Sequence, residues 1–399
     1  MGVLEGHTII SSYRIFFLFL LLKFMSANEP TQYDAVLGGK NPPPINAAVL
    51  GGIAGVKQRL ASPLAEARLA ALSEAINYGE AGLEAAITVF DDADERVRAT
   101  AAAMFCREEQ IRLLEKGTAI WNQWRVQNLL LLGGFVDLSW ANLSGANLSG
   151  ANLRESNLAG ANFGSSNLQT AKIFQSNLEV TNLRNANLSG ANLSRSNLSG
   201  ADLQGANLSQ ANLRSVNLRE ANLCQSILKK AKLGGADLSG ADLTGADLSG
   251  ADLSGVELSG AKLTKVNLAG IKLIRSNLSG WNFKGLVLAG ANLRWSTFAG
   301  ACFALADLHG ANLERADLTN ADFYQADFTG ANLCDADFNK ATLAGANLSG
   351  AVVKRASFLK ANLSGANFKK ANLSGAILKK ANIDGAKFTD ANLSRCAWT

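Results

Sequence analysis

The chain has 399 residues, of which 48% are hydrophobic but only 7% aromatic, and its formal net charge is +5. A mean hydropathy of +0.07 and a charged fraction of 18% exclude a polytopic membrane protein and a charged, disordered chain. All five prolines occur by residue 63, whereas 26 of the 38 glycines follow residue 135. The chain therefore consists of two differently built parts.

The cysteines and histidines predict no reactive centre. Five cysteines with no C-x-x-C pair support neither a disulfide framework nor a metal site, and they favour a reducing compartment. No Ser/His/Asp, Cys/His or paired-carboxylate arrangement can be assembled. We therefore expect no enzyme, no cofactor, no metal and no small-molecule substrate. A charge of +5 is also too weak to indicate nucleic-acid binding.

The N-terminal end, residues 1–25, contains a run of eight apolar residues at 15–22. This run is much shorter than the ~20 residues that span a bilayer. The preferred interpretation is an over-extended reading frame with the true start at Met25, which predicts a cytoplasmic protein. A signal or anchor remains an alternative and would place the protein in the thylakoid lumen or the periplasm. A buried N-terminal strand is the third interpretation.

Residues 26–116 predict a small helical domain, because alanine is abundant and apolar residues recur at helical spacing. Ser62 and Pro63 predict an N-cap and first turn of a helix that ends at Gly79. A second helix is expected over 80–90, and a third from about Asp94. Aligning Arg68 with Arg98 reveals an internal repeat of 30 residues.

Part of this repeat resembles a known helical motif. The pattern is formed by Asp92, Val97, Arg98, Ala101 and Ala102, and it resembles HEAT-type repeats. The stretch from Tyr33 to Arg107 is also similar to a small helical module at the start of several cyanobacterial proteins. The resemblance implies a surface that binds partners. A folding cap or spacer for the following region is the alternative.

From Val136 onward the chain follows a five-residue rule without insertion. We call the positions of each unit i−2 to i+2, with i at 138, 143 and so on to 393, which gives 52 units. Position i is Leu in 39 units and Phe in ten, and position i−2 is Ala in 37. Position i−1 is Asn or Asp in 38 units, and position i+2 is Gly in 24.

This pattern predicts short extended segments joined by corners. Positions i−2 and i are two residues apart, so on an extended backbone both point inward while i−1 points out. Glycine or a polar residue at i+2 supplies the corner, because glycine adopts positive φ readily. A single unit cannot bury its leucine, so successive coils must stack and pair their backbones.

These units match the A(D/N)LxX motif, and the region resembles the pentapeptide-repeat family. The resemblance implies a right-handed, four-sided β-helix with 20 residues per coil, about 13 coils and a length of about 60 Å. The phenylalanine spacing agrees, since four pairs at position i lie 20 apart: Phe283–Phe303, Phe303–Phe323, Phe338–Phe358 and Phe368–Phe388. The predicted fold class is therefore mainly β, preceded by the small α-helical domain.

Both ends of the array, residues 136–399, need covering. Residues 117–135, which include Trp121 and a run of four leucines, predict a linker and an N-terminal cap. No further segment follows the last coil, so an open edge is expected there. We predict that this C-terminal end is a self-association surface that forms a homodimer.

Departures from the rule mark the candidate binding residues. Trp281 occupies an i−2 position and would overpack the interior, so we expect the array to bulge there or the indole to turn outward. Lys340, Lys360 and Lys380 are all at i+2 and 20 apart, so they should stack on one edge. Arg355 should form a charge ladder with Arg315 and Asp335. An anionic partner or a merely solvated edge would both fit the lysines.

Five consecutive units carry an acid at i−1: Asp237, Asp242, Asp247, Asp252 and Glu257. Some pentapeptide-repeat proteins mimic DNA to inhibit gyrase, but these acids would form a belt rather than an axial stripe. The leading prediction is a non-enzymatic protein–protein interaction scaffold with an unidentified protein partner. The alternatives are a DNA-mimic regulator of a topoisomerase such as gyrase, and an exported structural protein.

Overall fold

The computed structural model describes residues 52–131, 134 and 136–398. The predictions for residues 1–25, and for the domain between 26 and 51, lie outside the described residues. The chain divides into two compact units, Met1–Gly55 and Val56–Thr399. The first unit contributes only the start of helix α2 to the description.

The helical predictions are confirmed in kind. The helices are α2 (Gly52–Leu60), α3 (Ala65–Ala75), the 3-10 turn η1 (Ile76–Tyr78), α4 (Gly79–Ile87), α5 (Glu95–Ala103), α6 (Arg107–Glu115) and α7 (Thr118–Leu131). Helix α3 packs against α4 and α5, α5 packs against α7, and α6 packs against α7. The rings of Phe90, Phe105 and Trp124 form the buried centre, with centroids 5.5 and 6.3 Å apart.

One predicted cap is wrong and another is confirmed. Helix α3 starts at Ala65, and the N-cap position is Leu64 rather than Ser62. Ser62 precedes a proline, which disfavours helical backbone there, so its hydroxyl accepts a hydrogen bond from Leu64 N at 3.2 Å instead. Asp94 does cap α5, because its Oδ1 accepts the Arg96 N–H at 2.8 Å. The hydrogen bonds from Arg96 lower the pKa of Asp94 to about 2.

The two aligned arginines make the same local contact. Arg68 Nη1 donates to Ser62 O at 2.7 Å, and Arg98 Nη1 donates to Asp92 O at 2.6 Å, each six residues back. Arg68 also pairs with the buried Asp92 at 2.7 Å. This equivalence supports the internal repeat, while the HEAT-type assignment stays a prediction.

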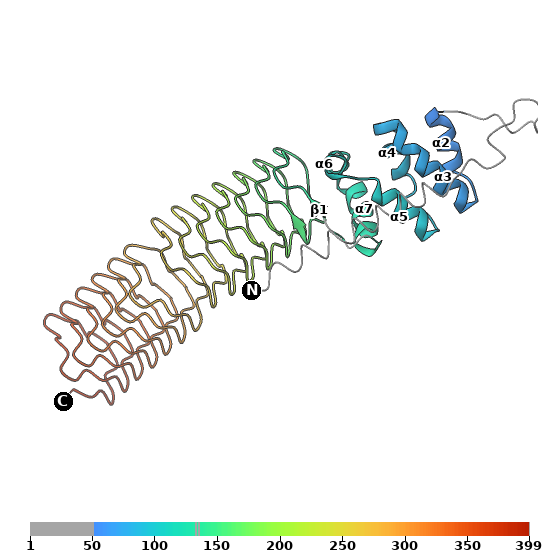
Figure 1. The fold of residues 1–399 in the computed structure, drawn as a ribbon. Coiled ribbons are helices and arrows are strands. Elements are labelled where there is room, and N and C mark those ends of the chain that lie inside the picture. Colours follow the sequence, from blue (N-terminus) through green and yellow to red (C-terminus); the bar gives the residue numbers. More distant parts are fainter. Residues whose placement is uncertain (1–51, 132–133, 135, 399) are drawn as a thin grey trace, which may run out of the picture. The chain divides into compact units, whose positions relative to one another are not determined.

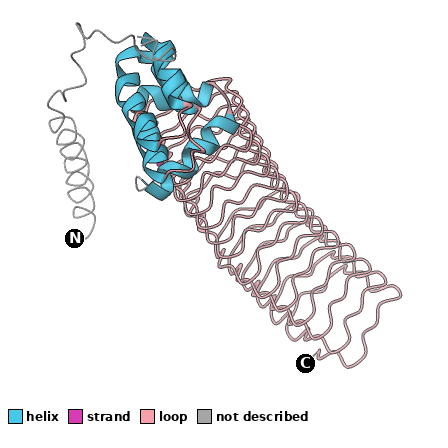
Figure 2. Ribbon diagram, turned by 90° about the vertical axis from the view of Figure 1, so that its right-hand side faces the viewer, coloured by secondary structure: helices cyan, strands magenta, loops and turns pink. Residues whose placement is uncertain are grey.

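Residues 136–398 form the stacked coils that the repeat predicted, drawn from green to red in Figure 1. Strand β1 (Val136–Asp137) pairs in parallel with β2 (Ser156–Asn157), with Val136 opposite Ser156. Parallel bridges then link residues 20 apart as far as Ile377 and Ala397. The coil of 20 residues is therefore confirmed. Each straight segment is so short that most of the array is drawn as loops in Figure 2.

The interior is built as the unit pattern requires. The i and i−2 side chains are buried along most of the array, and the i−1 side chains mostly lie at the surface. All four predicted phenylalanine pairs are stacked, with centroids 4.7 to 5.1 Å apart: Phe283–Phe303, Phe303–Phe323, Phe338–Phe358 and Phe368–Phe388. The four-sided β-helix thus has a continuous apolar core of leucine, alanine and stacked rings.

The corners adopt left-handed backbone at position i+2. Glycine is the common residue there, but Lys340 and Trp140 also have φ of 60°. Asparagines at i−1 strengthen the stack from outside. Asn162 Nδ2 donates to Asn142 Oδ1 at 3.0 Å, and Asn182 Nδ2 donates to Asn162 Oδ1 at 2.8 Å. Such ladders join coils at the surface, in addition to the backbone bonds.

Candidate functional site

Four faces run along the β-helix, and we number them by their i positions: first face 138, second 143, third 148 and fourth 153, each continuing in steps of 20. The three lysines of the predicted column lie at the corner between the first and second faces. Lys340 N donates to Leu359 O at 2.9 Å, and Lys360 N donates to Lys379 O at 3.1 Å, so their coils are adjacent. All three side chains are exposed.

The lysine column (Lys340, Lys360 and Lys380) is unusual because nothing in the described chain neutralises it. No carboxylate of the described residues lies within ion-pair distance of these ammonium groups, as the ion pairs of the array involve other residues. The surrounding stretch 338–399 contains ten basic and two acidic residues. Successive lysines about 4.8 Å apart repel one another, so the column does not stabilise the fold.

The predicted charge ladder is confirmed. Arg355 Nε lies 2.7 Å from Asp335 Oδ1, and Arg315 Nε lies 3.8 Å from Asp335 Oδ2. The hydrogen bond from Arg355 lowers the pKa of Asp335. Arg315 also covers the ring of Trp295 at 4.5 Å. Arg355 is therefore engaged within the chain, and a binding role for it stays a prediction.

The stretch around Trp281 interrupts the ladder of coils. Within residues 136–398, no bridge joins Glu257 to Asn277 or Lys262 to Asn282. Several N–H groups on the first and second faces lose their bond to the next coil: Gly255, Leu258, Gly260, Leu263 and Lys265. The third and fourth faces stay joined, for example through Leu268 N and Val287 O at 2.9 Å. We call this opening on two faces the seam.

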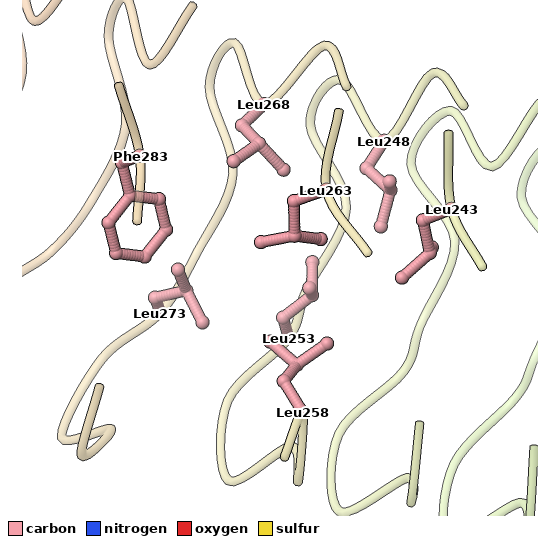
Figure 3. A pocket seen from close by; sticks show the side chains of 8 residues that line it. All are labelled: Leu243, Leu248, Leu253, Leu258, Leu263, Leu268, Leu273 and Phe283. Atoms are coloured by element: carbon pink, nitrogen blue, oxygen red, sulfur yellow. The ribbon is translucent and has the colours of Figure 1, made fainter. Parts of the chain in front are cut away.

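The residue at i−2 explains the seam. Trp281 faces a slot sized for alanine and is half-buried, and Ala261 and Leu263 in the preceding coil are also half-buried. The interior leaves a cavity of about 10 Å³, lined by seven leucines and Phe283. Figure 3 shows these side chains directed into the interior. A purely apolar space of this size stays dry. The predicted irregularity is present, and ligand binding at Trp281 remains untested.

The acidic belt is largely neutralised by neighbouring coils. Arg219 pairs with Asp237, Lys229 with Asp247 and Lys262 with Asp242, at 3.2, 3.3 and 3.2 Å: three ion pairs for five acids. Hydrogen bonds from Thr244, followed by those from Cys224 and Lys262, lower the pKa of Asp242. These pairs weigh against a DNA-like negative face.

Helix α7 contacts the first coil with polar side chains. Trp121 Nε1 donates to Asn152 O at 2.8 Å, and Asn122 bonds both Gly150 O and Asn152 N, at 3.0 and 2.7 Å. The buried Arg125 donates to Arg154 O. The Asn152 N–H thus finds a side-chain acceptor where later coils offer a backbone carbonyl. Burial lowers the pKa of Arg125 to about 10.

Two further features were missed from the sequence. Serines at i−2 on the first face form an internal column: Ser156 N donates to Ser176 Oγ, and Ser176 N donates to Ser196 Oγ at 3.1 Å. Their spacing of 20 residues was the available signal. Cys106, Glu108 and Glu109 bring one ligand atom each within 4.8 Å. Three groups at the start of one helix fall short of the four ligands of structural zinc.

Comparison with known families decides the affiliation. The pentapeptide repeats model matches residues 136–173, 176–214, 206–245, 241–280, 282–315, 316–355 and 356–395. These segments cover well over half of the chain. The chain belongs to the pentapeptide repeat family. Such repeats form right-handed, four-sided β-helices, as the register of 20 residues requires.

Solved structures include several pentapeptide repeat proteins. HetL, involved in heterocyst differentiation regulation in the cyanobacterium Nostoc sp. PCC 7120, is 31% identical, with 64% of this chain and 90% of HetL covered and a TM-score of 0.28. Rfr23 from Cyanothece 51142 is 26% identical over 32% of this chain and 91% of its own, with a TM-score of 0.24.

QnrB1, a plasmid-mediated fluoroquinolone resistance protein, is 16% identical over 58% of this chain and 87% of its own, with a TM-score of 0.21. No curated protein sequence matches the chain. Because all of these TM-scores are low, the assignment rests on the repeat model. No helix in the described part of the chain is long and apolar enough to cross a membrane.

Proposed function

We propose that this pentapeptide repeat protein is a non-enzymatic scaffold that binds an acidic segment of a partner protein along the lysine column. The observation that carries the proposal is the stack of Lys340, Lys360 and Lys380 with no carboxylate in reach among the described residues. Repulsion within the column is relieved when an anionic chain lies along it. Family members generally act by interaction rather than catalysis, which agrees with this role.

The parts on the N-terminal side have supporting roles in this proposal. Residues 26–116 would be a HEAT-like module with a second docking surface, and residues 117–135 a cap on the first coil. The contacts of α7 with Gly150, Asn152 and Arg154 support the cap. We also propose a cytoplasmic location. The predicted homodimer through the C-terminal end stays a prediction, with Ile383 and Trp398 exposed in the last units.

The proposal is tested with the triple variant Lys340→Glu/Lys360→Glu/Lys380→Glu. The wild-type chain should bind an oligo-glutamate peptide in a fluorescence-anisotropy titration, and this binding should weaken with salt. The triple variant should lose at least about tenfold in affinity, because attraction becomes repulsion. The matched control is Lys172→Glu/Lys232→Glu/Lys272→Glu on the fourth face, which should bind like wild type. Equal losses in both variants would contradict the proposal.

A further inference from the structure

The corner between the second and third faces has an ordered charge pattern over four successive coils. The first coil presents Lys262 and Lys265, the second Lys284, the third Asp307, and the fourth Asp322 and Asp327. The outward charges along this corner therefore run +2, +1, −1 and −2. We call this surface the graded edge.

The register places these residues on neighbouring coils. Bridges join Asn267 to Val287, Val287 to Asp307, and Asp307 to Asp327 on the third face. On the second face, bridges join Asn282 to Cys302 and Cys302 to Asp322. At the corner itself, Leu305 N donates to Tyr324 O at 2.8 Å. The seam falls between the first and second coils of the graded edge.

Most of these charges have no opposite partner within the described residues. Lys262 pairs with Asp242, and Asp307 contacts His309. Lys265, Lys284, Asp322 and Asp327 form no ion pair. The opposite corner behaves differently: Arg294 pairs with Glu314 at 3.0 Å, and Asp335 lies between two arginines. The graded edge alone of these two corners keeps charge of both signs available.

Apolar side chains lie in the middle of the graded edge. Val287, Leu305 and Tyr324 are 41%, 51% and 47% exposed, and they come from its second, third and fourth coils. On the opposite corner the arginine Arg315 covers the exposed Trp295. An exposed apolar centre flanked by charge is the arrangement of a protein interface, in which burial supplies affinity and charge supplies register.

We infer that the graded edge binds a second copy of this chain, side by side and antiparallel. Reversing the coil order places +2 against −2 and +1 against −1 at every level, whereas a parallel arrangement opposes like charges. The contact is isologous, because the same four coils serve both partners around a two-fold axis. The axis falls between the coils of Lys284 and Asp307. This inference goes beyond the proposed function and does not depend on the lysine column.

Sedimentation of the full chain tests the inference. We expect a monomer–dimer equilibrium at about 0.1 M salt that weakens at least about tenfold at about 1 M, where the screening length falls from about 10 Å to about 3 Å. Lys265→Glu/Lys284→Glu makes the edge acidic and should give monomers. Asp307→Lys/Asp327→Lys makes it basic and should also give monomers. An equimolar mixture of the two variants should form a heterodimer, because their edges are complementary.

Both variants use residues that the repeat already tolerates at those positions. Glu220 and Glu314 occupy i+2 and i+1 elsewhere, and Lys232 occupies i−1. Arg275→Glu at the opposite corner is the matched control and should associate like wild type. A wild-type chain that stays monomeric at low salt, self-association that survives either reversal, or a mixture without heterodimer would each overturn the inference. Circular dichroism confirms that every variant keeps its β-helix.

Discussion

A single side chain can open a β-helix whose neighbouring coils are closed. Most i−2 positions hold alanine, which fits between the strand and the core, whereas Trp281 brings a bulky indole to the same slot. The lost bonds include those of Leu258 and Leu263 to the next coil. Because each backbone bond contributes about 0.5–1.5 kcal/mol net, the seam is the weakest section of the stack.

Trp281→Ala should therefore close the seam. We expect the backbone amides of 255–265 to gain partners and the midpoint of chemical unfolding to correspond to about 2 kcal/mol more stability, since several restored bonds outweigh the partly buried indole. Hydrogen exchange followed by mass spectrometry measures the amides directly. Trp295→Ala, at an exposed corner, is the control and should leave these amides unchanged. Unaltered exchange in Trp281→Ala would contradict the explanation.

At the scale of elements, helix α7 does for the first coil what each coil does for the next. Its side chains offer a donor to Gly150 O and an acceptor to Asn152 N, both through Asn122. Without such partners the starting edge would expose unpaired backbone groups and invite aggregation. The fold thus begins with a helix whose polar side chains substitute for a strand.

Asn122→Ala should destabilise the start of the array by about 1–3 kcal/mol, because it leaves two backbone groups without partners. The expected signal is faster amide exchange in residues 150–154, with little change beyond the next coils. Val126→Ala is a matched control, since Val126 is an exposed residue of the same helix. Equal exchange in wild type and Asn122→Ala would show that α7 does not cap the array.

At the scale of the whole array, charge alternates along the sequence and hence along the coils. Residues 237–257 contain five acids and no base, 258–296 six bases and no acid, 297–337 seven acids and one base, and 338–399 ten bases and two acids. A DNA mimic needs a continuous negative face along the axis, and these bands interrupt it. The alternation instead favours contacts with proteins of matching charge order.

We therefore expect no inhibition of gyrase. In a supercoiling assay, the full chain should leave the rate unchanged at concentrations where a DNA-mimic protein inhibits. Charge bands of alternating sign give attraction and repulsion that cancel over the length of the DNA-binding surface. A pentapeptide repeat protein with known gyrase inhibition serves as the positive control. Inhibition by this chain would restore the topoisomerase alternative.

The sequence alone determined the coil, because a period of five with a large apolar residue at i permits one inward-facing arrangement of short strands. The 20-residue spacing of phenylalanines, confirmed by the stacked pairs, and the column of Arg315, Asp335 and Arg355 followed from that period. Local repetition makes such contacts readable, since every unit meets the equivalent residue of the next coil.

Only the tertiary structure decided how departures from the period are accommodated. Trp281 could have turned outward or bulged the array, and packing against Ala261 and its neighbours opened two faces instead. The start of α3 moved past Ser62, because the proline after it and the surrounding helices set the backbone there. Which charges are satisfied within the chain also depended on side-chain reach between coils. That reach separates the paired opposite corner from the graded edge, although both have both signs of charge in their sequence.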